Sequence, residues 1–265
     1  MALSTKGISN SEGAGASYST GEFFLATSNG FRGGYKTSTN SISCSVLAGE
    51  GLKMERDYDY DVTRHLEDLQ KPSFIGKSAA EKAIQRLNPK KVKSCKTTVV
   101  FDKRISNDLL GYFASAISGP AIARETSFLK DSLNKNIFSK EISIIDNPKI
   151  SRGLGSRPFD GEGIKTNEKE LVSNGILNTW ILNTSTAKKL NLRTTGHASR
   201  SVGSPPGVGT SNLYMTNGIN SFEDMIKSIN SGFYATELIG MGVNLITGDY
   251  SMGAGGLWIE KGEIA

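Results

Sequence analysis

Alternation of hydrophobic and polar positions divides the chain into a strand-rich first part and a mixed second part. Three runs between residues 15 and 60 follow the period of β-strands: Phe23–Leu25, Ile42–Ala48 and Leu52–Tyr60. Turn-forming residues separate the runs: Asn29-Gly30, Gly33-Gly34 and Gly49-Glu50-Gly51. The pattern predicts a β-meander whose third strand, around Asp57–Asp61, is acidic and aromatic.

Two short helices and a boundary are expected after this meander. The helices fall at Thr63–Leu69 and Ser78–Leu87, and the stretch Asn88–Lys96 that follows is polar, basic and contains a proline. We therefore predict two units, residues 1–92 with the meander and its helices, and residues 93–265 as a second domain.

The second domain opens on a strand signal, Thr97–Phe101, followed by an apolar, small-residue stretch over Asn107–Phe128. Apolar residues recur there at helical spacing: Leu110, Phe113, Ile117 and Ala121. Ser106–Asp108 are residue types that cap helix N-termini. Pro120 has no N–H for an i−4 hydrogen bond and crowds that carbonyl, which predicts a kink in the helix.

The remainder is a mixture of strands, short helices and loops. Expected strands are Glu141–Ile145, Glu170–Ser173, Ile176–Asn183, Ser211–Met215 and several within Phe233–Ile264. Asn174-Gly175 predicts a type I′ hairpin turn. Helices are expected at Ser185–Asn191 and from a Ser221 cap to Asn230, closed by Gly232. Strands and helices do not alternate as βαβ units, so the predicted fold class is α+β with antiparallel sheet dominant.

Composition and charge narrow the function classes. With 265 residues, 37% hydrophobic and 22% charged, the chain is neither disordered nor inserted in a membrane. The net charge of +5 is mild and spread along the chain, which argues against a nucleic-acid partner. Cys44 and Cys95 lack metal or redox spacing, and the N-terminus has no apolar targeting segment. We expect free thiols and a cytoplasmic protein.

Metal and acid–base chemistry find little support in the residues. Neither His65 nor His197 has a second histidine or a glutamate at the spacing that places two ligands on one helix face. The stretch between Leu109 and Arg124 contains no histidine, cysteine or acid. We expect no metal or cofactor in this chain. His65 is interpreted as a solvated surface residue. His197 either stabilises its loop, which is the favoured interpretation, or lines a cleft.

The most unusual stretch is the loop Arg152–Gly163, which holds four glycines, a proline and four charges. Arg152 and Arg157 are able to grip carboxylates, while Asp160 and Glu162 are able to hold amines. These four residues, with His197, are the candidate cleft for a peptide or partner. The equally supported alternative is a structural loop whose charges are internally paired.

Several long stretches are distinctive enough to carry a resemblance: Ala116–Arg124, Thr126–Leu133, Arg152–Gly163, Thr195–Ala198, Thr236–Asn244 and Trp258–Ile264. Together with Asn10–Gly13 they resemble the TldD/PmbA family, and specifically its PmbA (TldE) branch. The resemblance implies the family's C-terminal domain, preceded by part of its β-rich middle region.

The same resemblance implies a cytoplasmic heterodimeric metallopeptidase that degrades or matures unfolded peptides. In TldD-like chains a His-Glu-x-x-x-His helix carries zinc, and that helix corresponds to Leu109–Ser118 here, which has no ligand. The chain is thus expected to be the non-catalytic partner of a TldD-like subunit, helping to form the substrate channel. Whether it has enzymatic activity of its own stays open.

Departures from the family pattern raise two further expectations. The chain starts close to the Ser-Glu-Gly segment and stops soon after Trp258–Ile264, as an incomplete family member would. Gly256–Glu260 would then be an unpaired edge strand that makes the chain depend on a partner. The alternative functions are a protein- or nucleic-acid-binding modulator, as the family's DNA gyrase modulator name suggests, and an inactive remnant of a split gene.

Overall fold

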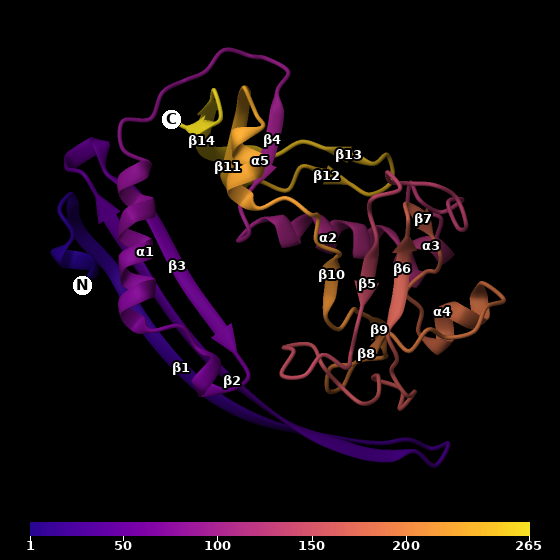
Figure 1. Ribbon diagram of the computed structural model, residues 1–265. Helices are drawn as coiled ribbons and strands as arrows, with labels where there is room; N and C mark the ends of the chain where they lie inside the picture. The colour runs from indigo at the N-terminus through magenta and orange to yellow at the C-terminus, as the bar shows by residue number, and fades with distance from the viewer.

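The alternating runs of the first part form a three-stranded antiparallel sheet in the computed structural model, which describes residues 1–265 (Figure 1). The strands run in the order β1 (Ile8–Ala26), β2 (Arg32–Ala48) and β3 (Glu55–Thr63). Helix α1 (Pro72–Gln85) packs on one face. Its alanines, with Ile75, bury Val46 and Ala48 of β2, so the face of the sheet under α1 is apolar.

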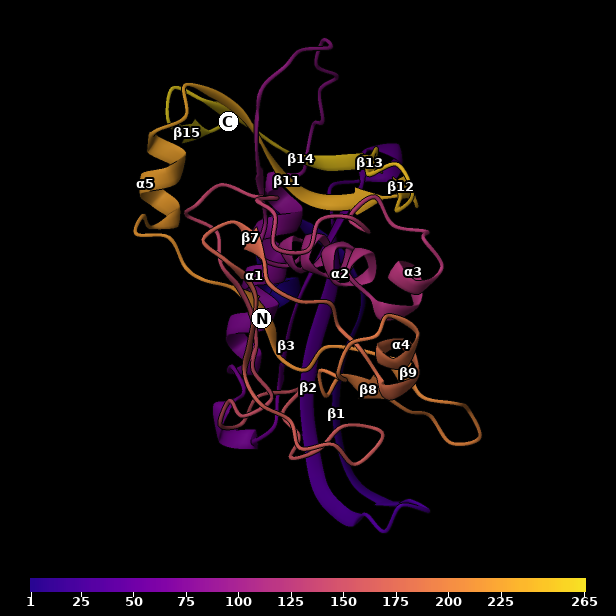
Figure 2. The same cartoon turned by 90° about the vertical axis from the view of Figure 1, so that its right-hand side faces the viewer.

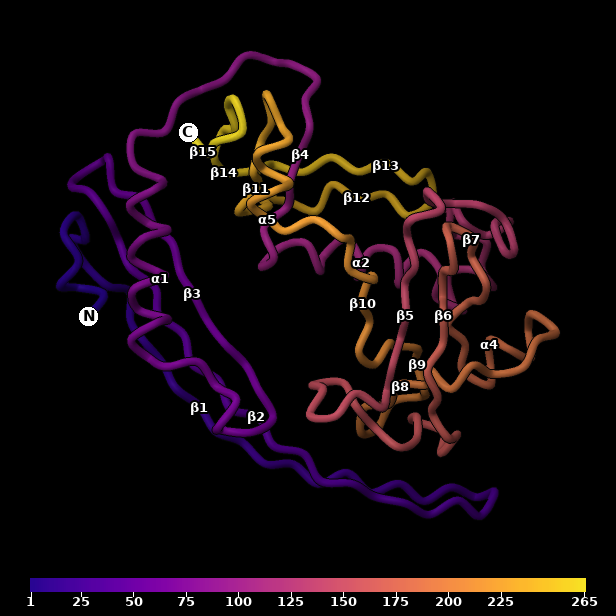
Figure 3. Tube along the Cα trace, viewed as in Figure 1, coloured from indigo at the N-terminus to yellow at the C-terminus, as the bar shows by residue number.

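Strands β1 and β2 continue beyond the part that α1 covers and form a long two-stranded arm under the second unit (Figure 3). At its tip Phe31 and Tyr35 contact the ring of Phe159, with ring centroids 4.8 and 5.5 Å apart. The predicted turn at Gly33-Gly34 is wrong, because both residues lie inside β2. A side chain at Gly33 would meet Phe31 and Phe159 within 3 Å, so close ring packing explains this glycine.

The helices of the first part differ from the expectation in their limits. Only a 3-10 turn, Leu66–Asp68, forms within the expected helix Thr63–Leu69, and two others lie at Ala2–Ser4 and Gly51–Lys53. Helix α1 begins at Pro72, before the expected Ser78, because proline suits the first helical turn, where no N–H partner is needed. Residues 88–97 then form an extended linker that arches to the second unit (Figure 2).

The linker leads into β4 (Thr98–Phe101), which pairs in parallel with β11 (Ser231–Ile239). The full sheet has the order β15-β14-β11-β4, in which β14 is Gly253–Glu260 and β15 is Glu263–Ile264. The expectation that Gly256–Glu260 has no hairpin partner is therefore wrong at its end, since Ile264 pairs with Ile259. Gly232, expected to close a helix, lies in β11 instead.

The apolar stretch after β4 forms two helices, α2 (Ser106–Ala116) and α3 (Gly119–Ala123). The predicted kink is a complete break, because Pro120 stands in the first turn of α3 and starts a helix rather than bending one. The predicted side-chain cap at Ser106–Asp108 is wrong. Ile105 occupies the N-cap position, and no side chain caps the helix there.

A second four-stranded sheet, of order β10-β5-β6-β7, packs beside these helices. Its strands are β5 (Ile144–Asp146), β6 (Lys169–Ser173), β7 (Ile176–Leu177) and β10 (Leu213–Met215). The hairpin turn is confirmed, since Asn174 and Gly175 both have positive φ, at 48° and 82°. Strand β5 begins at Ile144, later than the expected Glu141.

The remaining elements are short: α4 (Thr184–Lys189), β8 (Ala198–Ser199), β9 (Gly207–Val208), α5 (Phe222–Lys227), β12 (Val243–Asn244) and β13 (Asp249–Tyr250). Ser221 caps α5 as expected, and its hydroxyl accepts the N–H of Asp224. The main core joins α2, α3 and α4 to strands β5–β7 through thirteen buried residues, among them Ile117, Leu171 and Leu182.

The predicted α+β class is confirmed, because helices are few and all strand pairs but β4–β11 are antiparallel among the named strands. Both cysteines are free thiols, with Cys44 buried and Cys95 exposed. No helix has the length and apolar character that a membrane crossing requires.

Candidate functional site

The charged loop at residues 152–163 joins the two units through an ion pair. Arg152 donates to Asp68 at 2.8 Å and lies 3.2 Å from Glu67, both in the segment after β3. A second pair joins the units elsewhere: Arg86, just after α1, lies 2.6 Å from Glu237 of β11. Arg152 stays about half-exposed, so its charge is shared between a contact with the first unit and solvent.

Arg157 and Asp160 organise the loop from inside. One guanidinium nitrogen of Arg157 donates to the carbonyl of Gly209 at 3.0 Å, and its Nε is buried without a partner. The Asp160 side chain is 1% exposed; its Oδ1 accepts the N–H groups of Glu162 and Ile164 at 2.9 Å, and its Oδ2 accepts a third from β8. Asp160 is therefore a carboxylate that fixes backbone, not a group open to a ligand.

Glu162 and His197 are likewise occupied by the protein itself. The Glu162 carboxylate accepts the backbone N–H and the hydroxyl of Thr184 at 2.8 and 2.6 Å. His197 is 2% exposed, with Nδ1 2.8 Å from the Thr195 hydroxyl and Nε2 3.2 Å from Asp146. These contacts are the ones expected of a loop-stabilising histidine.

The alternative of internally paired charges therefore describes Asp160, Glu162 and His197. Contact of Arg152 or Arg157 with a peptide or partner stays a prediction. The other histidine, His65, is about half-exposed beside Glu67, as expected of a surface residue.

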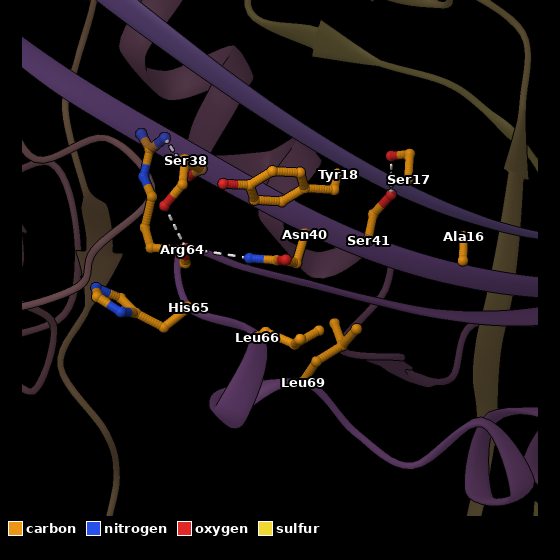
Figure 4. A pocket seen from close by; sticks show the side chains of 10 residues that line it. All are labelled: Ala16, Ser17, Tyr18, Ser38, Asn40, Ser41, Arg64, His65, Leu66 and Leu69. Carbon is orange, nitrogen blue, oxygen red and sulfur yellow. Dashed lines mark hydrogen bonds between the residues drawn. The ribbon is translucent and has the colours of Figure 1, made fainter.

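A polar hollow of about 610 Å³ lies where the arm meets the segment after β3, and Figure 4 shows its walls. Several of its polar groups bind one another. The Arg64 guanidinium donates to the Ser38 carbonyl at 3.0 Å, and the Arg64 backbone carbonyl accepts from the side-chain amide of Asn40. Ser17 and Ser41 share a hydrogen bond (Figure 4). The Tyr18 hydroxyl and the His65 ring, which also line the hollow, have no such hydrogen bond (Figure 4).

A different cavity, of about 400 Å³, lies beside α2, and all but two of its lining residues are hydrophobic. Leu109 and Tyr112 of α2 line it together with Val243, Asn244 and Tyr250 of the β12–β13 hairpin, which lies beside α2 in Figure 1. The two ends of this hairpin pack backbone against backbone, because a side chain at Gly242 would lie 1.6 Å from the Ser251 carbonyl oxygen. Distant segments thus build one apolar site that the linear pattern does not reveal.

The cavity has one sequence signal in retrospect. Helix α2 is apolar on more than the face that packs in the core, because Leu109 and Tyr112 each stand one position before a core position, Leu110 and Phe113. A helix of a soluble domain normally keeps that second face polar. An apolar second face indicates that another segment lies against it. Here that segment is the β12–β13 hairpin, and the cavity lies between the hairpin and α2.

Metal chemistry does not fit these residues. The family resemblance places a metal-binding helix at Leu109–Ser118, but α2 presents Leu109, Tyr112 and Phe113 to the cavity, none of which is a metal ligand. Elsewhere too, no group of three or more His, Cys, Asp and Glu side chains is placed to hold a metal ion. We therefore derive no catalytic step through a metal.

A buried charge cluster sets the position of α2 relative to the first unit. The Arg104 side chain, 4% exposed, donates to Asp57 of β3 at 2.6 Å and to Asp102 at 3.1 Å. The Tyr234 hydroxyl donates to the other oxygen of Asp102. Burial opposes ionisation of Asp102, but the Tyr234 hydrogen bond and the Arg104 interactions outweigh it and hold its pKa below the ordinary value. Arg104 therefore ties the start of the α2 segment to β3.

Comparison with known families gives matches along both units. The family described as "PmbA/TldA metallopeptidase central domain" matches residues 1–87, and "PmbA/TldA metallopeptidase C-terminal domain" matches residues 94–265. Metalloprotease PmbA of Escherichia coli O157:H7 is 39% identical over 259 residues, which cover 98% of this chain and 56% of the relative. The chain thus spans about half the length of that curated relative.

Solved structures agree with these matches. A Thermotoga maritima protein described as a modulator of DNA gyrase superposes with a TM-score of 0.91 and 31% identity, over 100% of this chain and 60% of that one. TldE from Thermococcus kodakarensis superposes with a TM-score of 0.79 over 95% of this chain and 57% of that one. At 23% identity, the latter likeness shows a shared fold.

Proposed function

The chain belongs to the PmbA/TldD metallopeptidase family, and from that premise we propose that it is the PmbA-type, non-catalytic subunit of a peptide-processing pair. Its role is to complete the channel that delivers unfolded peptides to a TldD-like subunit, which supplies the zinc site. The two free thiols agree with a pair that acts in the cytoplasm.

The observation that carries this proposal is the surface of α2. A metallopeptidase helix needs imidazole and carboxylate groups directed at the substrate. Here Leu109, Tyr112 and Phe113 take the corresponding place and line an apolar cavity. Such a surface supports binding of a substrate and does not support hydrolysis.

Reconstitution tests the proposal. The purified chain, a TldD-like protein from the same genome, and their mixture are each incubated with an unfolded casein fragment and zinc. We expect cleavage by the mixture, faster than by the TldD-like protein alone, and co-elution of the two proteins in gel filtration. Replacing the first histidine of the partner's metal motif is the matched control and should abolish cleavage.

Two results would contradict the proposal. Zinc-dependent cleavage by this chain alone would make it a catalyst, and a failure to co-elute with or stimulate the partner would remove the subunit role. The modulator alternative predicts affinity for duplex DNA that falls steeply with salt concentration, which a filter-binding titration measures.

A further inference from the structure

The apolar cavity beside α2 has the size and composition of a binding site. Its volume of about 400 Å³ lies within the usual range for ligand pockets, and aromatic rings from separate segments line it, among them Tyr112, Phe128 and Tyr250. Leu109, Phe128 and Met215 at its edge are 37%, 46% and 42% exposed. The cavity is therefore open to solvent at that edge, and a ligand is able to enter.

The walls select for an uncharged, bulky group. No charged side chain lines the cavity. The rings of Tyr112 and Tyr250 meet edge to face with centroids 6.1 Å apart. Burial, with smaller effects of Tyr112 and Asp108, raises the pKa of Tyr250. Its hydroxyl, like that of any tyrosine at neutral pH, is neutral and able to donate a hydrogen bond. A charged side chain would lose its hydration here without gaining a partner.

An unpaired strand edge borders the cavity. Strand β10 is at the edge of its sheet, and it bonds to β5 through residues 212, 214 and 216, as the bonds Asn147 N–H to Asn212 and Thr216 N–H to Ser143 show. The backbone groups of Leu213 and Met215 therefore point to the free edge. The Met215 side chain also lines the cavity, so the free edge and the cavity adjoin.

We propose that this cavity binds one bulky apolar side chain of an extended peptide whose backbone pairs with the free edge of β10. An added strand presents alternate side chains to the same face as Met215, which brings one of them to the cavity. The peptide class rests on the proposed function. The added statement is that the non-catalytic chain itself selects peptides by an aromatic or large aliphatic residue.

Binding of defined peptides tests this directly. The probes are capped, fluorescently labelled heptapeptides of serine and glycine with phenylalanine, leucine, serine or aspartate at the centre, titrated with the full chain by fluorescence anisotropy. Burial of one large apolar side chain predicts that the phenylalanine peptide binds about tenfold or more tightly than the serine peptide. The aspartate peptide should bind no better than the serine peptide.

Three variants locate the site. Leu109→Trp and Met215→Trp fill the cavity from partly exposed positions, and each should weaken binding of the phenylalanine peptide about tenfold. Met241→Trp is the matched control, because Met241 is 98% exposed just before β12 and lies outside the lining. It should bind as the unmodified chain does. Thermal unfolding of all three shows whether each variant is folded, and two filling variants protect the test against failure of one.

Defined outcomes overturn the proposal. Equal affinity for the phenylalanine and serine peptides, or full affinity in both filling variants, removes the cavity as the site. Unchanged binding of a peptide with N-methylated backbone beside the central residue removes the pairing with β10. These measurements need no partner, so loss of peptide selectivity with intact stimulation of a TldD-like protein would refute this inference and leave the proposed function standing.

Discussion

Replacing Arg104 by methionine perturbs the contact between the two units at its most buried charge. The substitution keeps an unbranched side chain of similar length but removes the donors to Asp57, at 2.6 Å, and to Asp102, at 3.1 Å. It also removes a hydrogen bond to the Tyr58 carbonyl at 2.8 Å. The side chains of Arg104 and Asp57 are each 4% exposed, so water does not replace the lost partner.

The size of the effect follows from what each carboxylate retains. Removing one member of a buried ion pair costs roughly 3–5 kcal/mol, because the other charge stays buried. Asp57 keeps Arg86 at 3.7 Å, and Asp102 keeps the Tyr234 hydroxyl and the backbone N–H of Arg104. We therefore expect the lower limit, about 3 kcal/mol of unfolding free energy, which corresponds to a fall in Tm of roughly 6 to 12 °C.

Urea and thermal unfolding followed by circular dichroism measure this loss. Arg56→Met is the matched control from β3, because Arg56 is half-exposed and pairs with Glu12 at 3.2 Å, so its loss should cost under about 1 kcal/mol. In the double variant Asp57→Asn with Arg104→Met, the buried Asp57 charge that has lost Arg104 is also removed. That variant should be more stable than the sum of the two single losses predicts.

The pH dependence of the unfolding free energy gives an independent check that Arg104 stabilises an ionised Asp102. The pKa of Asp102 is lowered in the folded protein, so its pairing stabilises above the unfolded pKa and is lost as pH falls through the folded value. The loss of unfolding free energy in Arg104→Met should therefore be largest near neutral pH and should shrink below about pH 4. A deficit under about 1 kcal/mol at neutral pH, or one that grows in acid, would refute the argument.

Three further outcomes are expected. Asp160→Asn should lower the unfolding free energy by about 1–3 kcal/mol and speed hydrogen exchange at the Ala198 amide, because an amide NH₂ replaces the oxygen that accepts this N–H. Unchanged exchange at Ala198 would contradict the contact. In an alkaline titration followed by ultraviolet absorbance, Tyr234 and Tyr250 should ionise above the ordinary pH for phenols, and Tyr250→Phe should remove one late step. Chelator-washed protein should hold less than stoichiometric zinc in metal analysis, whereas about one tightly held zinc per chain would overturn the non-catalytic reading.

Local signals in the sequence were sufficient for several elements of the fold. Alternation and turn residues predicted the meander of β1–β3, and Asn174-Gly175 predicted the hairpin of β6 and β7. Both patterns act over a few residues. Element limits were less reliable where a distant contact decides them. Gly33 has the sequence appearance of a turn residue, yet it lies in β2 opposite Leu25 of β1, and the Phe159 ring leaves no room for a side chain there.

The candidate loop shows the same division. Its composition identified residues 152–163 as exceptional, and the structure shows that Asp160, Glu162 and His197 hold neighbouring segments. A single sequence cannot distinguish a charge that binds a ligand from one that binds its own backbone. The distinction depends on which acceptors and donors the fold brings within about 3 Å.

By itself the sequence determined the α+β class, the two free thiols, the family and the absence of a metal motif on the helix after β4. Only the tertiary structure decided where the charges of Arg104 and Asp57 meet, 47 residues apart in the chain, and that Tyr112, Phe128 and Tyr250 surround one cavity. The physical reason is range. Propensity, turns and periodicity act between near neighbours, whereas burial and cavity shape depend on segments that meet only after the chain has folded.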